Sequence, residues 1–236
     1  MLECLKVYDI NSPKIRLGIP RDGGYVMPEL VLQKCTALFT YGVGGDTSYE
    51  AEFEHNYSKP VFMFDHTIGQ ENWQKGLLNF FNEGLGYQGC DDPRLKDVKE
   101  HYDSLGVEGQ IFLKIDTEGA EYEYFLNADI NMLSSFVVGM IIEVHWLEQE
   151  PNQVKFKTFM DKINKYFLVT HVHGNNWGGE FDYNGQTVPR VVEISFVNKN
   201  NITEFVSDSA SYPLEGIDFP NNPDQPDCSL NFLSTL

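Results

Sequence analysis

Short apolar runs alternate with segments of helical periodicity between Leu38 and Val197, and this alternation constrains the fold more than any other feature of the sequence. Such a pattern is typical of strand–helix–strand units around a mostly parallel sheet. We expect strands at Leu38–Tyr41, Val61–Phe64, Ile111–Ile115, Val138–Val144, Leu168–Val172 and Val191–Val197. The sequence therefore predicts an α/β fold with helices on both faces of the sheet.

Two helices and one hairpin have clear local signals. Thr47 and Glu50 have capping-box spacing, so a helix should begin near Ser48. A second helix is indicated by apolar side chains that recur at helical spacing, namely Phe156, Phe159, Met160, Ile163 and Phe167. Asn184-Gly185 predicts a two-residue hairpin, which favours an antiparallel last strand.

The length of 236 residues fits one domain. Within it we expect an N-terminal lid or helical segment (1–36), a Rossmann-like core (37–200) and an irregular, proline-rich tail (201–236). Two interpretations of Arg16–Leu30 stay open. It forms either a Gly23-Gly24 turn that leads into a helix, or part of a lid over a cofactor.

The chain is strongly acidic, with 35 acidic and 17 basic residues and a formal net charge of −18. Such a charge disfavours nucleic acids and anionic lipid surfaces as partners. The most apolar run, Phe136–Ile142, is too short to cross a membrane. No secretory signal is evident, and the four cysteines are widely spaced. We expect a soluble cytoplasmic protein whose oligomeric state the sequence does not indicate.

A glycine-rich turn, LFTYGVGGDTSYE, follows the first expected strand and leads directly into a helix. About 20 residues later, Asp65 ends the next strand, where an acid commonly binds ribose hydroxyls. Asp46 would repel a pyrophosphate and Thr47 replaces a fingerprint glycine, so the turn favours S-adenosylmethionine over a dinucleotide. The predicted cofactor-binding residues are Tyr41, Gly42, Val43, Gly44, Asp46, Ser48, Asp65 and His66.

Acids and histidines gather where the later strands end. The candidate catalytic residues are Asp116, Glu118, Glu143, His145 and His173, and His171 shares a strand face with His173. In an open α/β sheet the carboxyl ends of neighbouring strands form one ligand-binding edge. These groups would supply a general base or hold a divalent metal, for which Asp116, Glu143 and His145 are the candidate ligands. A purely structural role, in hydrogen bonds and helix caps, stays open for each residue.

The segment FLKIDTEGAEYEYF, Phe112–Phe125, resembles the signature of FkbM-like methyltransferases. RLGIPRDGGYVMPEL and HVHGNNW also resemble segments of that family, so the resemblance reaches about Val197. It implies a seven-stranded Rossmann-like class I methyltransferase sheet with an antiparallel last strand. It also implies S-adenosylmethionine as cofactor and O-methylation, often of sugars.

Individual positions of the resemblance carry specific roles. Gly42, Gly44 and Asp46 match the cofactor turn, Asp65 matches the ribose acid, and Asp116 and Glu118 match the signature acids. The turn YGVGGDTS departs from the family's commoner valine-glycine-alanine-asparagine pattern. The predicted function is therefore methyl transfer from S-adenosylmethionine to a carbohydrate hydroxyl. The alternatives are an amine, carboxylate or phenol acceptor, or a nucleotide-binding module without turnover.

Overall fold

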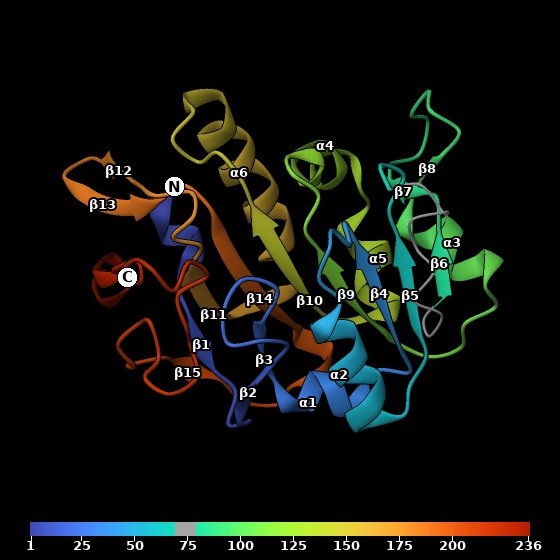
Figure 1. The fold of residues 1–236 in the computed structure, drawn as a ribbon, viewed down its shortest axis with the longest axis horizontal. Helices are drawn as coiled ribbons and strands as arrows, with labels where there is room; N and C mark the ends of the chain where they lie inside the picture. Colours follow the sequence, from blue (N-terminus) through green and yellow to red (C-terminus); the bar gives the residue numbers. More distant parts are fainter. Residues whose placement is uncertain (69–78) are drawn as a thin grey trace.

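The computed structural model describes residues 1–68 and 79–236, and a seven-stranded sheet forms its centre (Figure 1). The strand order is β11-β14-β10-β9-β4-β5-β6. The bounds are β4 Ala37–Tyr41, β5 Val61–Phe64, β6 Asn79–Phe81, β9 Ile111–Ile115, β10 Val137–Val144, β11 Phe167–Gly174 and β14 Val192–Asn198. The predicted α/β fold is confirmed, and each expected strand is present within two residues at either end.

All pairs from β10 to β6 are parallel, whereas β14 pairs antiparallel with both β10 and β11. The antiparallel last strand of the sheet is thus confirmed, and it lies between two strands rather than at the edge. The hairpin at Asn184-Gly185 is also confirmed, joining β12 (Glu180–Tyr183) to β13 (Gln186–Pro189). That hairpin forms a separate two-stranded sheet, so β14 owes its direction to its pairing with β10 and β11.

Apolar side chains alternate along the strands, and this alternation gives the sheet two buried faces. Phe39 packs in one core with α3 (Val98–Ser104), α4 (Ala120–Asn127), α5 (Ile130–Phe136) and α6 (Glu150–Ile163). Its neighbour Leu38 packs in the other core, with α1 (Glu29–Lys34) and α2 (Ser48–Tyr57). In Figure 1, α1 and α2 lie in front of the sheet. Helices on both faces are therefore confirmed.

Two helix predictions were wrong in detail. Phe167 starts β11 instead of ending α6, because the chain leaves the helix after Ile163. The capping box at α2 does not form, since Thr47 makes no side-chain cap. Glu50 is instead buried and faces the Lys114 ammonium at 3.5 Å, and the Asp46 carboxylate accepts the Ser48 N–H at 2.8 Å. A buried ion pair thus takes the carboxylate that the cap would have used.

Residues 14–28 form a short hairpin, β2 (Lys14–Leu17) with β3 (Tyr25–Pro28), which packs on the sheet near β14 and β11. Pro28 precedes α1 as its N-cap, so the turn-and-helix interpretation of this segment omitted a strand pair. The other small sheets are β1 (Tyr8–Asp9) with β15 (Val206–Ser207), and β7 (Gly84–Leu85) with β8 (Leu95–Lys96). Short 3-10 turns are η1 (Leu2–Leu5), η3 (Lys199–Asn201) and η4 (Asn231–Thr235).

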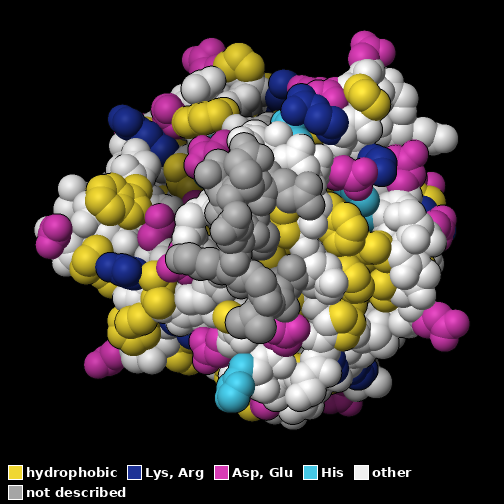
Figure 2. Space-filling model, turned by 45° about the vertical axis from the view of Figure 1, so that its right-hand side comes forward, with side chains coloured by type: hydrophobic (Ala, Val, Ile, Leu, Met, Phe, Trp, Pro, Cys, Tyr) yellow, Lys and Arg dark blue, Asp and Glu magenta, His cyan; other side chains and the backbone are white. Residues whose placement is uncertain are grey.

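The surface agrees with the acidic composition. On the face shown in Figure 2, acidic side chains are spread around the whole outline, whereas basic side chains gather in a few places. Within residues 1–68 and 79–236 no helix has the length and apolarity needed to cross a bilayer, and the 14-residue helix α6 is the longest of them.

Candidate active site

The glycine turn after β4 is shaped first by its contact with β9. A Cβ on Gly42 would lie 1.6 Å from the carbonyl oxygen of Asp116, and Gly42 has a φ of +76°. The two strand ends are held together here, because the Asp116 N–H donates to the Tyr41 carbonyl at 2.9 Å. Gly44 and Gly45 have no such neighbours, so a Cβ there would meet open space. Sheet packing therefore requires Gly42, while Gly44 leaves room beside the turn.

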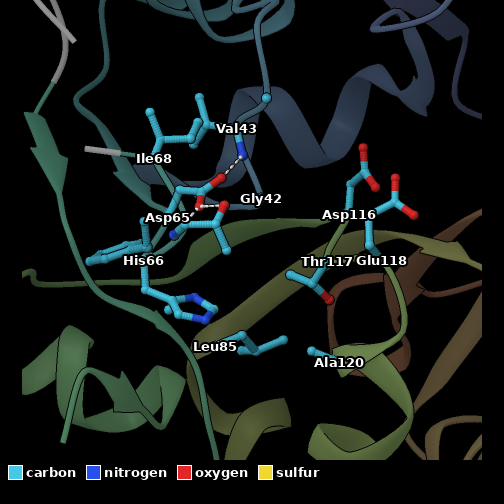
Figure 3. A pocket seen from close by; sticks show the side chains of 14 residues that line it. Gly42, Val43, Asp65, His66, Ile68, Leu85, Asp116, Thr117, Glu118 and Ala120 are labelled. Carbon is cyan, nitrogen blue, oxygen red and sulfur yellow. Dashed lines mark hydrogen bonds between the residues drawn. The ribbon is translucent and has the colours of Figure 1, made fainter. Parts of the chain in front are cut away.

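Asp65 fixes this turn from the end of β5 (Figure 3). Its carboxylate accepts the Val43 N–H at 3.0 Å, the Thr67 N–H at 2.8 Å and the Thr67 hydroxyl at 2.6 Å. Burial would raise the pKa of Asp65, but these hydrogen bonds outweigh burial and lower it. Asp65 is therefore an ionised, rigidly held hydrogen-bond acceptor at neutral pH.

A cavity of about 260 Å³ opens beside Asp65 and the glycine turn. Five of the predicted cofactor-binding residues line it: Gly42, Val43, Gly44, Asp65 and His66. Ile68 and Leu85 add an apolar wall that we did not predict. Leu85 lies on a strand of two residues, which is too short to give a periodic signal. On its other side the cavity is lined by Asp116, Thr117 and Glu118.

The other three predicted cofactor residues do not line this cavity. Tyr41 is fully buried, and its hydroxyl lies 3.0 Å from His101 Nδ1 inside the core. Asp46 caps the start of α2, and the Ser48 hydroxyl accepts the Ile19 N–H at 3.1 Å. Tyr41, Asp46 and Ser48 therefore make structural contacts around the turn.

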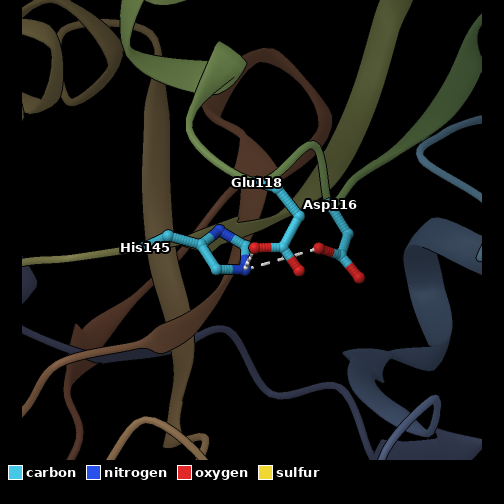
Figure 4. A group of neighbouring side chains, drawn as sticks. All are labelled: Asp116, Glu118 and His145. Carbon is cyan, nitrogen blue, oxygen red and sulfur yellow. Dashed lines mark ion pairs between the residues drawn. The ribbon is translucent and has the colours of Figure 1, made fainter. Parts of the chain in front are cut away.

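Asp116, Glu118 and His145 come together where β9 and β10 end (Figure 4). His145 Nε2 lies 3.7 Å from Asp116 Oδ1 and 3.5 Å from Glu118 Oε2. One ligand atom from each residue can be chosen so that all lie within 4.8 Å of one another. Of the predicted catalytic residues, these three therefore lie together at the strand ends, whereas His173 does not join them.

Glu121, on α4, holds the His145 side chain in place. Its buried carboxylate accepts the His145 backbone N–H at 3.1 Å and lies 3.4 Å from Nδ1. Burial lowers the pKa of His145, but this hydrogen bond and the charges of Glu143 and Asp116 raise it to about 9. Glu121 therefore orients the ring so that Nε2 faces the other acids.

Glu143 lies beside this cluster, and both of its carboxylate oxygens accept hydrogen bonds. The Tyr25 hydroxyl donates to Glu143 Oε2 at 2.8 Å and lies 3.1 Å from Asp116 Oδ2. The Asn175 amide donates to Glu143 Oε1 at 2.8 Å. Burial and the charges of Asp116 and Glu193 raise the pKa of Glu143 well above its usual range. Tyr25 was not predicted, because its contacts join residues about 100 positions apart that no local pattern connects.

A second cavity, of about 330 Å³, opens on the other side of Asp116 and Glu118. Its wall includes Glu143, His145, Asp22 and Asn175, and no lysine or arginine belongs to the described lining. Two tryptophans stand at the cavity, with exposed fractions of 42% for Trp146 and 62% for Trp177. The two cavities therefore share the Asp116 and Glu118 carboxylates as a common wall.

The backbone around the second cavity is locally strained. Glu118 and Trp146 have φ values of 50° and 55°, in the left-handed region that side chains rarely adopt. Gly119 has a φ of +101°, and a Cβ there would lie 2.4 Å from the Trp146 ring. The glycine of the DTEGAE segment thus lets the indole lie over the start of α4. Strained residues of this kind concentrate at functional sites.

His171 and His173 lie apart from the Asp116 cluster. His171 Nε2 donates to Asp218 at 2.9 Å, and both side chains are buried. His173 lies between two carboxylates, with Nδ1 3.0 Å from Glu193 and Nε2 3.1 Å from Asp227. Neither histidine lines the two cavities described above. Asp218 and Asp227 belong to the C-terminal tail, and the sequence did not indicate where this tail would lie.

The chain was compared with known protein families. Residues 11–176 match the methyltransferase FkbM domain. The chain belongs to the FkbM methyltransferase family. This FkbM methyltransferase is accordingly an S-adenosylmethionine-dependent enzyme, as the DTEGAE resemblance implied.

Searches for relatives of this FkbM methyltransferase gave further comparisons. No curated protein matches it. Among solved structures, a Streptococcus mutans protein in complex with SAH is 11% identical, with 72% of this chain and 93% of that chain covered and a TM-score of 0.38. An rRNA methylase from Streptococcus thermophilus is 12% identical, with 71% and 89% covered and a TM-score of 0.40. A SAM-dependent methyltransferase from Archaeoglobus fulgidus is 12% identical, with 72% and 88% covered and a TM-score of 0.37.

Proposed function

We propose that this enzyme transfers a methyl group from S-adenosylmethionine to a hydroxyl of a neutral carbohydrate. The observation that carries the proposal is that two cavities meet at Asp116 and Glu118. A methyl donor in the first cavity and an acceptor in the second would face each other across these carboxylates. Holding two reactants in this way supplies much of the acceleration of a displacement reaction.

The first cavity suits the methyl donor. Asp65 offers ionised oxygens to the ribose hydroxyls, and Ile68 with Leu85 offers an apolar surface to the adenine. The donor's sulfonium and ammonium groups are cationic, and Asp116 and Glu118 on the far wall favour them electrostatically. A donor bound in this way would bring its transferable methyl group to the wall of Asp116 and Glu118 that both cavities share.

Asp116 is the residue we propose as general base. Its carboxylate borders both cavities, and Tyr25 and His145 flank it at 3.1 Å and 3.7 Å. As the bond from the acceptor oxygen to the methyl carbon forms and the sulfur–carbon bond breaks, the hydroxyl proton passes to this carboxylate. Glu118, Glu143 and His145 then shape the charge around the acceptor, and His173 takes no part in the reaction.

A divalent cation is a second arrangement that this donor set fits. Asp116, Glu118 and His145 offer two carboxylates and one imidazole, which suit Mn²⁺ or Mg²⁺ better than a soft metal. Glu143, which we expected as a ligand, already accepts hydrogen bonds from Tyr25 and Asn175. When bound, the cation would lower the pKa of the acceptor hydroxyl. Calorimetric titration with MnCl₂, and activity after EDTA treatment, distinguish this arrangement from the metal-free one.

The second cavity suits a sugar. Its carboxylates can accept hydrogen bonds from hydroxyls, and the exposed rings of Trp146 and Trp177 offer flat surfaces to the C–H faces of a pyranose. The lining also disfavours two alternatives, since an anionic acceptor such as a carboxylate or a nucleic acid would be repelled. The second candidate acceptor is an amine, because acids and tryptophans also attract ammonium groups.

An acceptor screen tests the proposal. The enzyme is incubated with S-adenosylmethionine and, in separate reactions, with neutral saccharides, amino sugars, aliphatic amines and phenols. The masses of the products are measured by mass spectrometry. We expect a gain of one methyl group on a saccharide, and its loss in Asp116→Asn. The matched control is Asp161→Asn, an exposed acid on α6 that pairs with Lys157 and lines neither cavity. Methylation of amines or phenols alone would overturn the carbohydrate assignment.

A further inference from the structure

The C-terminal tail crosses the end of β11, beside the acceptor cavity. After β15 the chain returns over this side of the sheet, drawn in red in Figure 1. Asp218 binds His171 at 2.9 Å and Asp227 binds His173 at 3.1 Å. The family match ends at residue 176, so the tail lies outside the matched region.

Asn221 is the tail residue that reaches the cavity wall. It is buried, with an exposed fraction of 1%. Its side-chain amide nitrogen donates to Glu193 Oε1 at 2.7 Å and lies 3.2 Å from Asp22 Oδ1, and its backbone carbonyl oxygen accepts the Asp22 backbone N–H at 3.2 Å. Asp22 is thus held by Asn221 through both its backbone and its side chain.

The chain of contacts continues to the proposed acceptor. Asn175 lies 3.4 Å from the same Asp22 oxygen and donates to Glu143 at 2.8 Å, and Asp22, Asn175 and Glu143 all line the acceptor cavity. Three carboxylates, Asp22, Glu143 and Glu193, therefore lie in one hydrogen-bond network, in which Glu143 and Glu193 are buried and Asp22 is exposed. The side-chain amides of Asn175 and Asn221 lie between these carboxylates and donate hydrogen bonds to them. These donors offset the repulsion between neighbouring acids.

We propose that Asn221 is a positioning residue for acceptor binding: by holding Asp22, and through it Asn175 and Glu143, the tail sets the arrangement of hydrogen-bonding groups that the acceptor meets. The proposal rests on the second cavity being the acceptor site. It assigns the tail a role in acceptor selection, while the methyl donor binds on the other side of Asp116, away from these groups.

The test compares Asn221→Ala with a matched buried asparagine. Asn198 is fully buried at the opposite end of β14, and its amide donates to the carbonyls of Ser134 and Val137 at 2.7 Å each. Both substitutions remove a buried amide that donates two hydrogen bonds, so both should lower the melting temperature. We expect only Asn221→Ala to raise the acceptor KM, by about tenfold or more, as the loss of roughly 1.4 kcal/mol of hydrogen bonding predicts. The affinity for S-adenosylhomocysteine should stay within twofold of wild type in both variants.

Asp22→Asn provides a second variant in case Asn221→Ala does not fold. The substitution keeps the shape of the side chain but removes the negative charge that the amides of Asn175 and Asn221 contact. The acceptor KM should therefore rise here too. An unchanged acceptor KM in a folded Asn221→Ala or Asp22→Asn variant of an active enzyme overturns this proposal alone. Absence of turnover of any acceptor by the wild-type enzyme would overturn the proposed function, and this inference with it.

Discussion

Gly42 offers the sharpest test of how the cofactor turn is built. An alanine Cβ at this position would lie 1.6 Å from the Asp116 carbonyl oxygen, a backbone atom that cannot rotate away. Overpacking of this kind costs about 1–3 kcal/mol, and a non-glycine residue in the left-handed region costs about 1–2 kcal/mol more. We therefore expect Gly42→Ala to destabilise the fold by about 2–5 kcal/mol. In a chain of this size each kcal/mol shifts the melting temperature by roughly 2–4 °C.

Thermal and urea unfolding followed by circular dichroism measure this effect. Gly45→Ala is the control, because a Cβ there meets nothing within 4 Å and its φ lies outside the left-handed region, so its stability should stay within about 0.5 kcal/mol of wild type. Gly44→Ala should fall between the two, since its space is open but its φ is +57°. A Gly42→Ala protein as stable as Gly45→Ala would refute the view that strand packing fixes this turn.

Three further predictions concern the donor, the acceptor and pH. Asp65→Asn should weaken S-adenosylhomocysteine binding by about 10–100-fold in calorimetry, because a charged hydrogen-bond partner contributes about 1.5–3 kcal/mol, whereas Asp46→Asn should change it less than twofold. Trp177→Ala should raise the KM for a saccharide about tenfold with the donor KM unchanged, and an unchanged saccharide KM would remove the stacking role. Burial lowers the pKa of His173, but Glu193 and Asp227 raise it to about 10, well above the unfolded value of about 6.5. Its stabilisation is therefore complete below pH 6.5 and is lost as pH rises toward 10, so the unfolding free energy of wild type relative to His173→Gln should fall over that window; a constant difference would contradict the assignment.

Much of the fold follows from local patterns. Val61–Phe64 and Ile111–Ile115 match their predicted strands because each is a short apolar run bounded by polar residues. The boundary at Phe167 was wrong because its helical spacing from Ile163 is also compatible with the start of the next strand. Asn184-Gly185 predicted its hairpin correctly, because the turn of a two-residue hairpin depends mainly on its two central residues.

The site was predictable only where strand ends define it. Asp116, Glu118 and His145 were placed together because the carboxyl ends of neighbouring parallel strands share one edge. Tyr25 and Asn221 were missed because each reaches the site from a distant segment through a single side chain. Glu121 was missed because the sequence places it on a helix but does not indicate that its side chain turns back to His145.

Binding of the methyl donor is the central claim, and calorimetric titration of S-adenosylhomocysteine into the wild-type protein tests it most directly. We predict one site per chain with a dissociation constant on the order of micromolar, as expected for an enzyme cofactor. The same titration into Asp65→Asn should show the weakened binding described above. If neither S-adenosylhomocysteine nor S-adenosylmethionine bound the wild-type protein at millimolar concentration, the placement of the donor beside Asp65 would be contradicted.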